Sequence, residues 1–83
     1  MIIVDFRDIK YVRLKIAKEG KSLRDFARKI GISQSYLSQL LNKKHPPSAQ
    51  VAYKIANGLG EEVDKIFLIK VIDKTITTSK QGD

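Results

Sequence analysis

The feature that most constrains this chain is a pair of short helical segments separated by only three residues. Ser22 and Asp25 have the spacing of a capping box, in which each side chain accepts the backbone N–H of the other residue at the start of a helix. Gly31 can end that helix in the left-handed conformation, and Ser33 can cap the next helix. Residues 22–42 therefore predict two helices joined by a tight turn.

Two helices joined so tightly must cross steeply, and the small residue Ala27 permits the close approach of their axes. This is a helix-turn-helix arrangement, in which the second helix can enter a DNA major groove about 12 Å wide. The second helix, Gln34 to Asn42, has an outward side that is polar and uncharged. A solvating side would favour Glu and Lys, whereas this side suits hydrogen bonds of defined geometry.

The charge of the chain is concentrated in the same region. The 83 residues include 16 Lys+Arg and 9 Asp+Glu, for a net charge of +7. Residues 1–54 carry twelve basic and four acidic side chains, whereas residues 55–83 carry four and five, so the two parts have net charges of +8 and −1. Concentrated positive charge favours a polyanion such as nucleic acid, and a solubilising surface is the alternative.

Three further helices are predicted around this unit. The first ends near Glu19-Gly20 and begins at Asp5 or Asp8, the fourth begins at Ser48 after a loop with two prolines, and the fifth spans Glu62 to Phe67. Arg13, Lys15 and Lys18 in the first helix are expected to form a solvated face. The residues expected to face the core are Ile9, Val12, Ile16, Ala17, Phe26, Ala27, Ile30, Leu37, Leu40, Leu41, Ala52, Ile55, Ala56, Leu59, Val63, Ile66 and Phe67.

Both ends of the chain have strand patterns. Leu68 to Thr78 is rich in Ile, Val and Thr, and Met1 to Val4 is a second β-prone segment. These strands could pair with each other or with a partner subunit, because an exposed apolar edge is unfavourable in solution. We expect one mainly α domain over residues 1–83, with a helical core at 8–67 and a disordered tail at 79–83.

Residues 22–42 resemble the Cro/C1-type (XRE-like) helix-turn-helix family. The resemblance continues through Pro47-Ser48, Ile55-Ala56 and Leu59-Gly60 to residues 63–67. It implies a five-helix lambda-repressor-like DNA-binding domain. The ordered set of motifs is more specific than any one of them.

The resemblance implies particular contacts with DNA. Gln34 and Ser35 occupy positions of base contact, and Asn42 is where the loop after the recognition helix meets phosphate. Ser38 and Gln39, one turn further along, are the other candidates for base contact, and the Gln34 amide can pair with adenine N6 and N7. The other candidates for phosphate contact are Ser22, Arg24, Tyr36, Lys43, Lys44 and His45.

Two positions depart from the pattern of this family. Many members begin the first helix of the motif with a glutamine, which holds a phosphate and braces the first glutamine of the recognition helix. Here that residue is Leu23, so the brace is absent. The acidic residue that is frequent late in the recognition helix is Leu41, which cannot make a polar tie to the following loop. Nearby, Arg24, Arg28 and Lys29 could each face either phosphate or only water.

Other classes of function have little support in this sequence. One histidine and no cysteine leave no catalytic residue, metal site or cofactor to predict. No apolar run approaches the roughly 18 residues of a membrane span, so we expect a cytoplasmic, nucleoid-associated protein without a membrane or small-molecule partner.

The predicted function is sequence-specific binding of double-stranded DNA by a repressor-like or Cro-like transcriptional regulator. One recognition helix reads few base pairs, so a homodimer on a palindromic operator is expected, with the strand Leu68 to Ile76 as its possible interface. The alternative is a protein-interaction module on the same scaffold, such as an antitoxin or an antirepressor partner.

Overall fold

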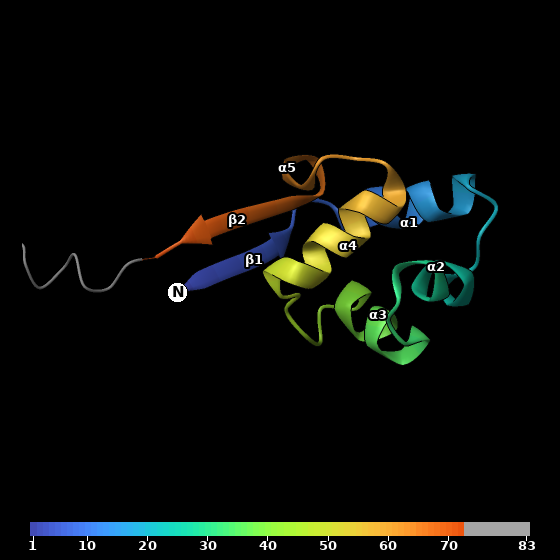
Figure 1. Cartoon of the computed structure of the whole chain (residues 1–83), viewed down its shortest axis with the longest axis horizontal. Coiled ribbons are helices and arrows are strands. Elements are labelled where there is room, and N and C mark those ends of the chain that lie inside the picture. Colours follow the sequence, from blue (N-terminus) through green and yellow to red (C-terminus); the bar gives the residue numbers. More distant parts are fainter. Residues whose placement is uncertain (73–83) are drawn as a thin grey trace, which may run out of the picture.

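The computed structural model describes residues 1–72, so the predictions for the strand beyond residue 72 and for the tail lie outside the described residues. Figure 1 shows the helices gathered into one body, with two strands extending from it as a ribbon. The predicted fold class, mainly α with terminal strands, is confirmed. The elements are β1 (Ile2–Phe6), α1 (Ile9–Lys18), α2 (Leu23–Ile30), α3 (Gln34–Leu41), α4 (Ala49–Leu59), α5 (Val63–Ile66) and β2 (Phe67–Val71).

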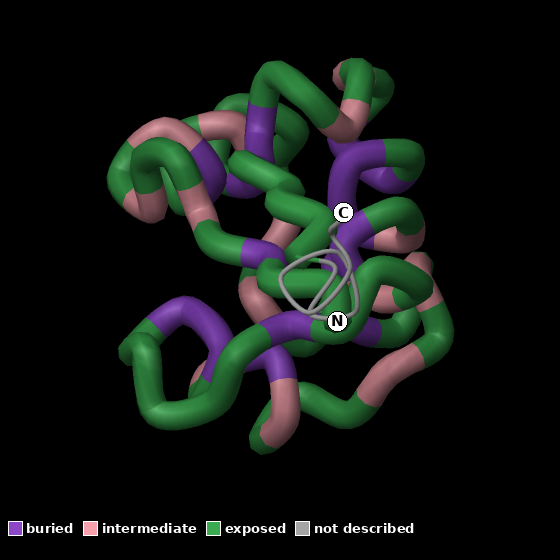
Figure 2. The backbone as a smooth tube through the Cα atoms, turned by 90° about the vertical axis from the view of Figure 1, so that its left-hand side faces the viewer, coloured by how far each residue is buried: buried purple, intermediate pink, exposed green. Residues whose placement is uncertain are grey.

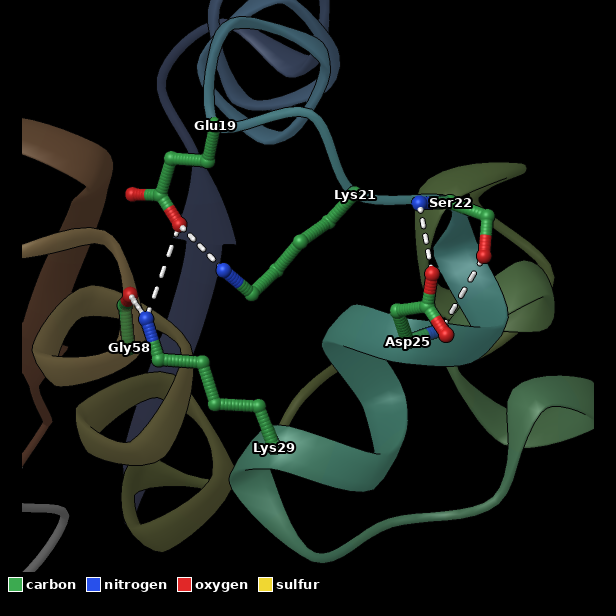
Figure 3. Close-up of polar contacts among 6 residues, drawn as sticks. All are labelled: Glu19, Lys21, Ser22, Asp25, Lys29 and Gly58. Carbon is green, nitrogen blue, oxygen red and sulfur yellow. Dashed lines mark hydrogen bonds and ion pairs between the residues drawn. The ribbon is translucent and has the colours of Figure 1, made fainter.

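Short polar side chains begin four of the helices, as predicted. The hydroxyls of Ser22, Ser33 and Ser48 each accept the backbone N–H three residues later, at 3.1, 3.1 and 3.2 Å. Asp8 caps α1. At α2 the contact is reciprocal, because the Ser22 N–H donates to the Asp25 carboxylate at 3.4 Å (Figure 3). Both bonds with Ser22 hold the pKa of Asp25 below its usual range.

All seven elements contribute side chains to one core. Figure 2 shows buried stretches alternating with exposed ones along the helices, as expected for amphipathic helices around a common interior. Ala17 was predicted to face this core but is exposed, because its neighbour Ile16 takes the inward position at the end of α1. The buried apolar residues are Val4, Val12, Ile16, Phe26, Ala27, Leu37, Leu40, Leu41, Ala52, Ile55, Ala56, Leu59, Ile66 and Phe67.

The helices α2 and α4 approach each other closely at Gly58. A Cβ atom there would lie 2.5 Å from Cγ2 of Ile30 and 3.2 Å from the ring of Phe26. Lys29 closes the same contact, because its ammonium donates to the Gly58 carbonyl at 2.8 Å and lies 3.5 Å from the Glu19 carboxylate (Figure 3). Lys29 is therefore a tie between three segments and does not face only water.

A second polar cluster joins α1 to the loop between α4 and α5. The Tyr11 hydroxyl donates to the Glu61 carboxylate at 2.6 Å, and the Lys15 ammonium lies 3.1 Å from the same oxygen. These contacts lower the pKa of Glu61 and raise the pKa values of Tyr11 and Lys15. The prediction that Lys15 belongs to a solvated face is thus wrong, since Lys15 pairs with Glu61 in the loop between α4 and α5.

The two strands pair within the chain. They are antiparallel, with Phe6 opposite Phe67 and Ile2 opposite Val71. Both strands reach further toward the helices than the sequence predicted, since β1 continues to Phe6 and Phe67 belongs to β2 instead of α5. Phe67 is extended because its ring packs 4.7 Å, centroid to centroid, from the ring of Phe6.

The apolar face of this ribbon is only half covered. Alternation along a strand places Ile2, Val4 and their partners on the side that meets the helices. Near the helices Val4 and Phe67 are buried, but at the far end Ile2 and Val71 are 57% and 75% exposed. The ribbon therefore extends apolar surface beyond the helical body.

No helix in residues 1–72 combines the length and the apolar character needed to cross a membrane.

We expect Gly58→Ala to destabilise the fold. Alanine favours helix, but its methyl group would overlap Ile30, and overpacking of this kind costs about 1–3 kcal/mol. Urea unfolding would show a lower midpoint with an unchanged slope. Asn57→Ala, at an exposed neighbouring position in α4, is the matched control and should not lower the midpoint. Equal stability of Gly58→Ala and the unaltered protein would contradict the close packing.

Candidate nucleic-acid interface

The turn between α2 and α3 has the geometry predicted from the sequence. Gly31 is left-handed, with a φ of 82°. Its N–H and that of Ile32 both donate to the Ala27 carbonyl, at 2.9 and 3.0 Å, so the end of α2 and the turn form one hydrogen-bonded unit. Ala27 is 1% exposed. The α2–turn–α3 segment is thus fixed by backbone bonds and packing, which gives α3 a defined direction relative to α2.

Helix α3 presents polar side chains to solvent. Gln34, Ser35 and Gln39 are exposed and come from the side opposite the buried leucines of this helix. Ser38 is half-buried, and its hydroxyl accepts a hydrogen bond from the Asn42 amide at 3.3 Å. The structure therefore brings the predicted base-contacting residues onto one face, with Ser38 more recessed than the other three.

The N-terminus of α2 lies beside this face. The guanidinium Nε of Arg24 donates to Oε1 of Gln34 at 3.5 Å, which joins the second residue of α2 to the first residue of α3. Leu23, at the position where the family has its glutamine, is half-buried and apolar. Ser22 is exposed and is engaged with Asp25 in the capping box.

The loop after α3 carries the predicted basic group. Lys43, Lys44 and His45 are all exposed. Tyr36 is half-buried and meets His45 edge to face, with the ring centroids 5.8 Å apart. Tyr36 thus supports the loop from α3. A loop placed in this way sets Lys43 and Lys44 beside the C-terminal end of the polar face of α3.

Lys43 has an unusual backbone. The N–H groups of Lys43 and Lys44 donate to the carbonyls of Leu40 and Gln39, at 3.1 and 2.9 Å, a Schellman pattern that requires a left-handed residue. The same pattern ends α1, α2 and α4 at glycine residues. At α3 the left-handed residue is Lys43, with a φ of 58°, and within residues 1–72 no other non-glycine residue has a positive φ. This conformation costs a residue with a side chain about 1–2 kcal/mol.

Arg13 was not predicted to belong to this surface. Its Nη2 donates to Oδ1 of Asn42 at 3.3 Å, although the two residues are 29 positions apart in the sequence. The contact ties α1 to the end of α3, where Leu41 is only 3% exposed and apolar. The sequence predicts a solvated position for Arg13, because no short-range pattern relates two residues that are so far apart in the chain.

The cations near the polar face of α3 are available for a partner. The ion pairs within residues 1–72 involve Lys15, Lys21 and Lys29, whose partners are Glu61 and Glu19. Arg24, Lys43 and Lys44 form no ion pair in that part of the chain. Within the same residues no group of His, Asp and Glu side chains could hold a metal ion. The surface is therefore suited to a polyanion.

Comparison with known proteins agrees with this geometry. Residues 9–66 match the protein family described as helix-turn-helix. The match begins with the first residue of α1 and ends with the last residue of α5. The chain is also 32% identical over 60 residues to an uncharacterized HTH-type transcriptional regulator of Methanocaldococcus jannaschii, a match that covers 72% of this chain and 86% of that protein.

We expect Lys43→Gly to raise the stability of the protein by about 1 kcal/mol, since glycine adopts the left-handed conformation without steric cost. Chemical denaturation would show a higher midpoint. Lys44→Gly is the control, because Lys44 does not have a positive φ, and this change should lower stability through the greater entropy of the unfolded chain. A higher midpoint for both variants, or for neither, would contradict the strain at Lys43.

Proposed function

Because the chain belongs to the Cro/C1-type (XRE-like) helix-turn-helix family of DNA-binding regulators, we propose that it is a sequence-specific repressor-like regulator that inserts α3 into the major groove. The observation that carries this proposal is the exposed, uncharged face of α3 between cations that form no ion pair in residues 1–72. Hydrogen-bonding groups at the centre suit base edges, and cations at the rim suit phosphates.

The proposed division of labour follows the chemistry of the side chains. Gln34, Ser35 and Gln39 read base edges, and the more recessed Ser38 accepts from the Asn42 amide while its O–H remains free to donate to a base. Phosphates on one side meet the N-terminus of α2, where the positive end of the helix dipole adds to the attraction. Ser22 and Arg24 lie at this end, and Tyr36, Asn42, Lys43, Lys44 and His45 lie at the other.

We propose that the operator-binding form is a homodimer. One recognition helix contacts too few base pairs for useful specificity, so two copies on a palindromic site are needed. Since β2 pairs with β1 within the chain, the proposed interface is the uncovered apolar end of the ribbon face, around Ile2 and Val71. Burial of this surface in a second copy would remove apolar area from water.

The two kinds of DNA contact can be separated by mutation. We expect Gln34→Ala to reduce the preference for one base pair by about 1–3 kcal/mol. Lys44→Ala should weaken all duplexes alike and reduce the slope of log K against log salt by about 0.9 for one lost phosphate contact. The measurement is selection of a duplex from random sequence, followed by titration at several salt concentrations. Failure to enrich any motif would reject sequence-specific binding and favour the protein-interaction alternative.

We expect Val71→Glu to abolish the dimer and leave the helical body folded, because Val71 is 75% exposed at the end of the ribbon. Sedimentation velocity at micromolar concentration would show a monomer, and binding to the palindromic duplex should weaken about a hundredfold while half-site binding is retained. Leu14→Glu, at an apolar residue of α1 that is 50% exposed, is the control. If both variants remain dimeric, the ribbon face is not the interface.

A further inference from the structure

We propose that Arg24 is a positioning residue that determines base specificity by orienting the amide of Gln34. The proposal rests on the proposed function, because it assigns a role within the surface that would read DNA. Its basis is the hydrogen bond from Arg24 Nε to Gln34 Oε1, at 3.5 Å, between two exposed side chains.

The contact has little purpose in folding. A bond of this length between solvated side chains contributes little to stability. Both backbone ends of the contact are nevertheless well fixed, since Arg24 lies within the Ser22–Asp25 capping box of α2 and Gln34 follows the Ser33 cap of α3. Two rigid helix starts therefore hold a flexible pair of side chains together at the surface proposed to face the major groove.

The direction of the bond matters because a glutamine amide has two unlike ends. Its oxygen accepts and its nitrogen donates, so a free Gln34 could present either end to a base. A donor from Arg24 selects the orientation in which Oε1 points toward α2 and Nε2 remains free to donate. The oxygen retains a second lone pair, so the paired amide can still accept from adenine N6 while Nε2 donates to adenine N7. The reverse orientation would place the Nε2 donor of Gln34 against the Nε donor of Arg24 and lose the bond.

Arg24 can do this and still meet the DNA backbone. The bond to Gln34 uses only Nε, and the two terminal nitrogens of Arg24 make no hydrogen bond or ion pair with residues 1–72. Those nitrogens leave the remaining donors of the guanidinium fork free for a phosphate or a base. Arg24 thereby supplies, from the second residue of α2, the brace that the apolar Leu23 cannot supply from the first.

Two substitutions separate the brace from the charge. In Arg24→Gln the Nε2 donor is attached to Cδ, as Nε is in arginine, so the brace is retained and the charge is lost. In Arg24→Lys the charge is retained, but the donor lies one bond further out and the planar fork is lost. Arg24→Ala removes both. Arg28→Ala is the control, because Arg28 is an exposed arginine one turn later in α2 that makes no bond to Gln34.

The experiment measures affinity for the selected duplex and for three duplexes altered at the base pair that depends on Gln34. We expect Arg24→Ala and Arg24→Lys to lose about fivefold discrimination at that base pair. Arg24→Gln should keep the discrimination while binding becomes less dependent on salt. Arg28→Ala should keep it too. In a Gln34→Ala background, Arg24→Ala should cause no further loss of discrimination.

Three results would overturn the proposal. Retained discrimination in Arg24→Ala would show that Gln34 needs no brace. Discrimination that is reduced equally in Arg24→Gln and Arg24→Lys would show that neither the retained donor nor the retained charge is sufficient to explain the effect. Normal discrimination in Gln34→Ala, on a duplex that is still bound specifically, would show that Gln34 is no base reader and leave regulation by DNA binding intact. Failure of every variant and of the unaltered protein to select DNA would instead reject the proposed function itself.

Discussion

The placement of α2 and α3 depends on one steric constraint, the contact of α2 with α4 at Gly58. The missing side chain lets the ring of Phe26 and the methyl group of Ile30 lie against the backbone of α4. Lys29 then ties the same turn to the carbonyl of Gly58 and to Glu19 at the end of α1 (Figure 3). Because α2 is held at this point and the Gly31 turn is hydrogen-bonded to α2, the direction of α3 is set by packing outside its polar face.

Two positions that usually make polar contacts in this family are apolar in this chain, and two arginines make polar contacts with α3 and the residue after it instead. Leu23 and Leu41 are apolar where the family has a glutamine or an acid. In the structure, Arg24 reaches the first residue of α3, and Arg13 reaches Asn42 just after its last residue. Each end of α3 is thus joined to a neighbouring helix by a cation, which holds α3 and adds positive charge beside the proposed phosphate positions at the same time.

Local signals in the sequence were sufficient for most of the fold. Serine caps and left-handed glycines act within four or five residues of themselves, so Ser22, Ser33 and Gly31 marked the helix ends correctly. Contacts between distant segments could not be predicted in this way. The ties of Arg13 and Lys29 depend on the assembled bundle. The strand boundaries shifted for the same reason, since the pairing of the Phe6 and Phe67 rings is a property of the folded chain.

The pairing of β1 with β2 has a consequence for the order of events during synthesis. β1 is made first, yet its partner is the last described element, and Met1 and Ile72 exchange hydrogen bonds across 71 positions of sequence. Such non-local contacts are the slowest to form, because a long loop must close before they give any stabilisation. The α2–turn–α3 unit, by contrast, consists of neighbouring residues that leave the ribosome together. A nascent chain therefore contains the whole α2–turn–α3 unit before the ribbon exists, and its two strands can pair only when synthesis has passed β2.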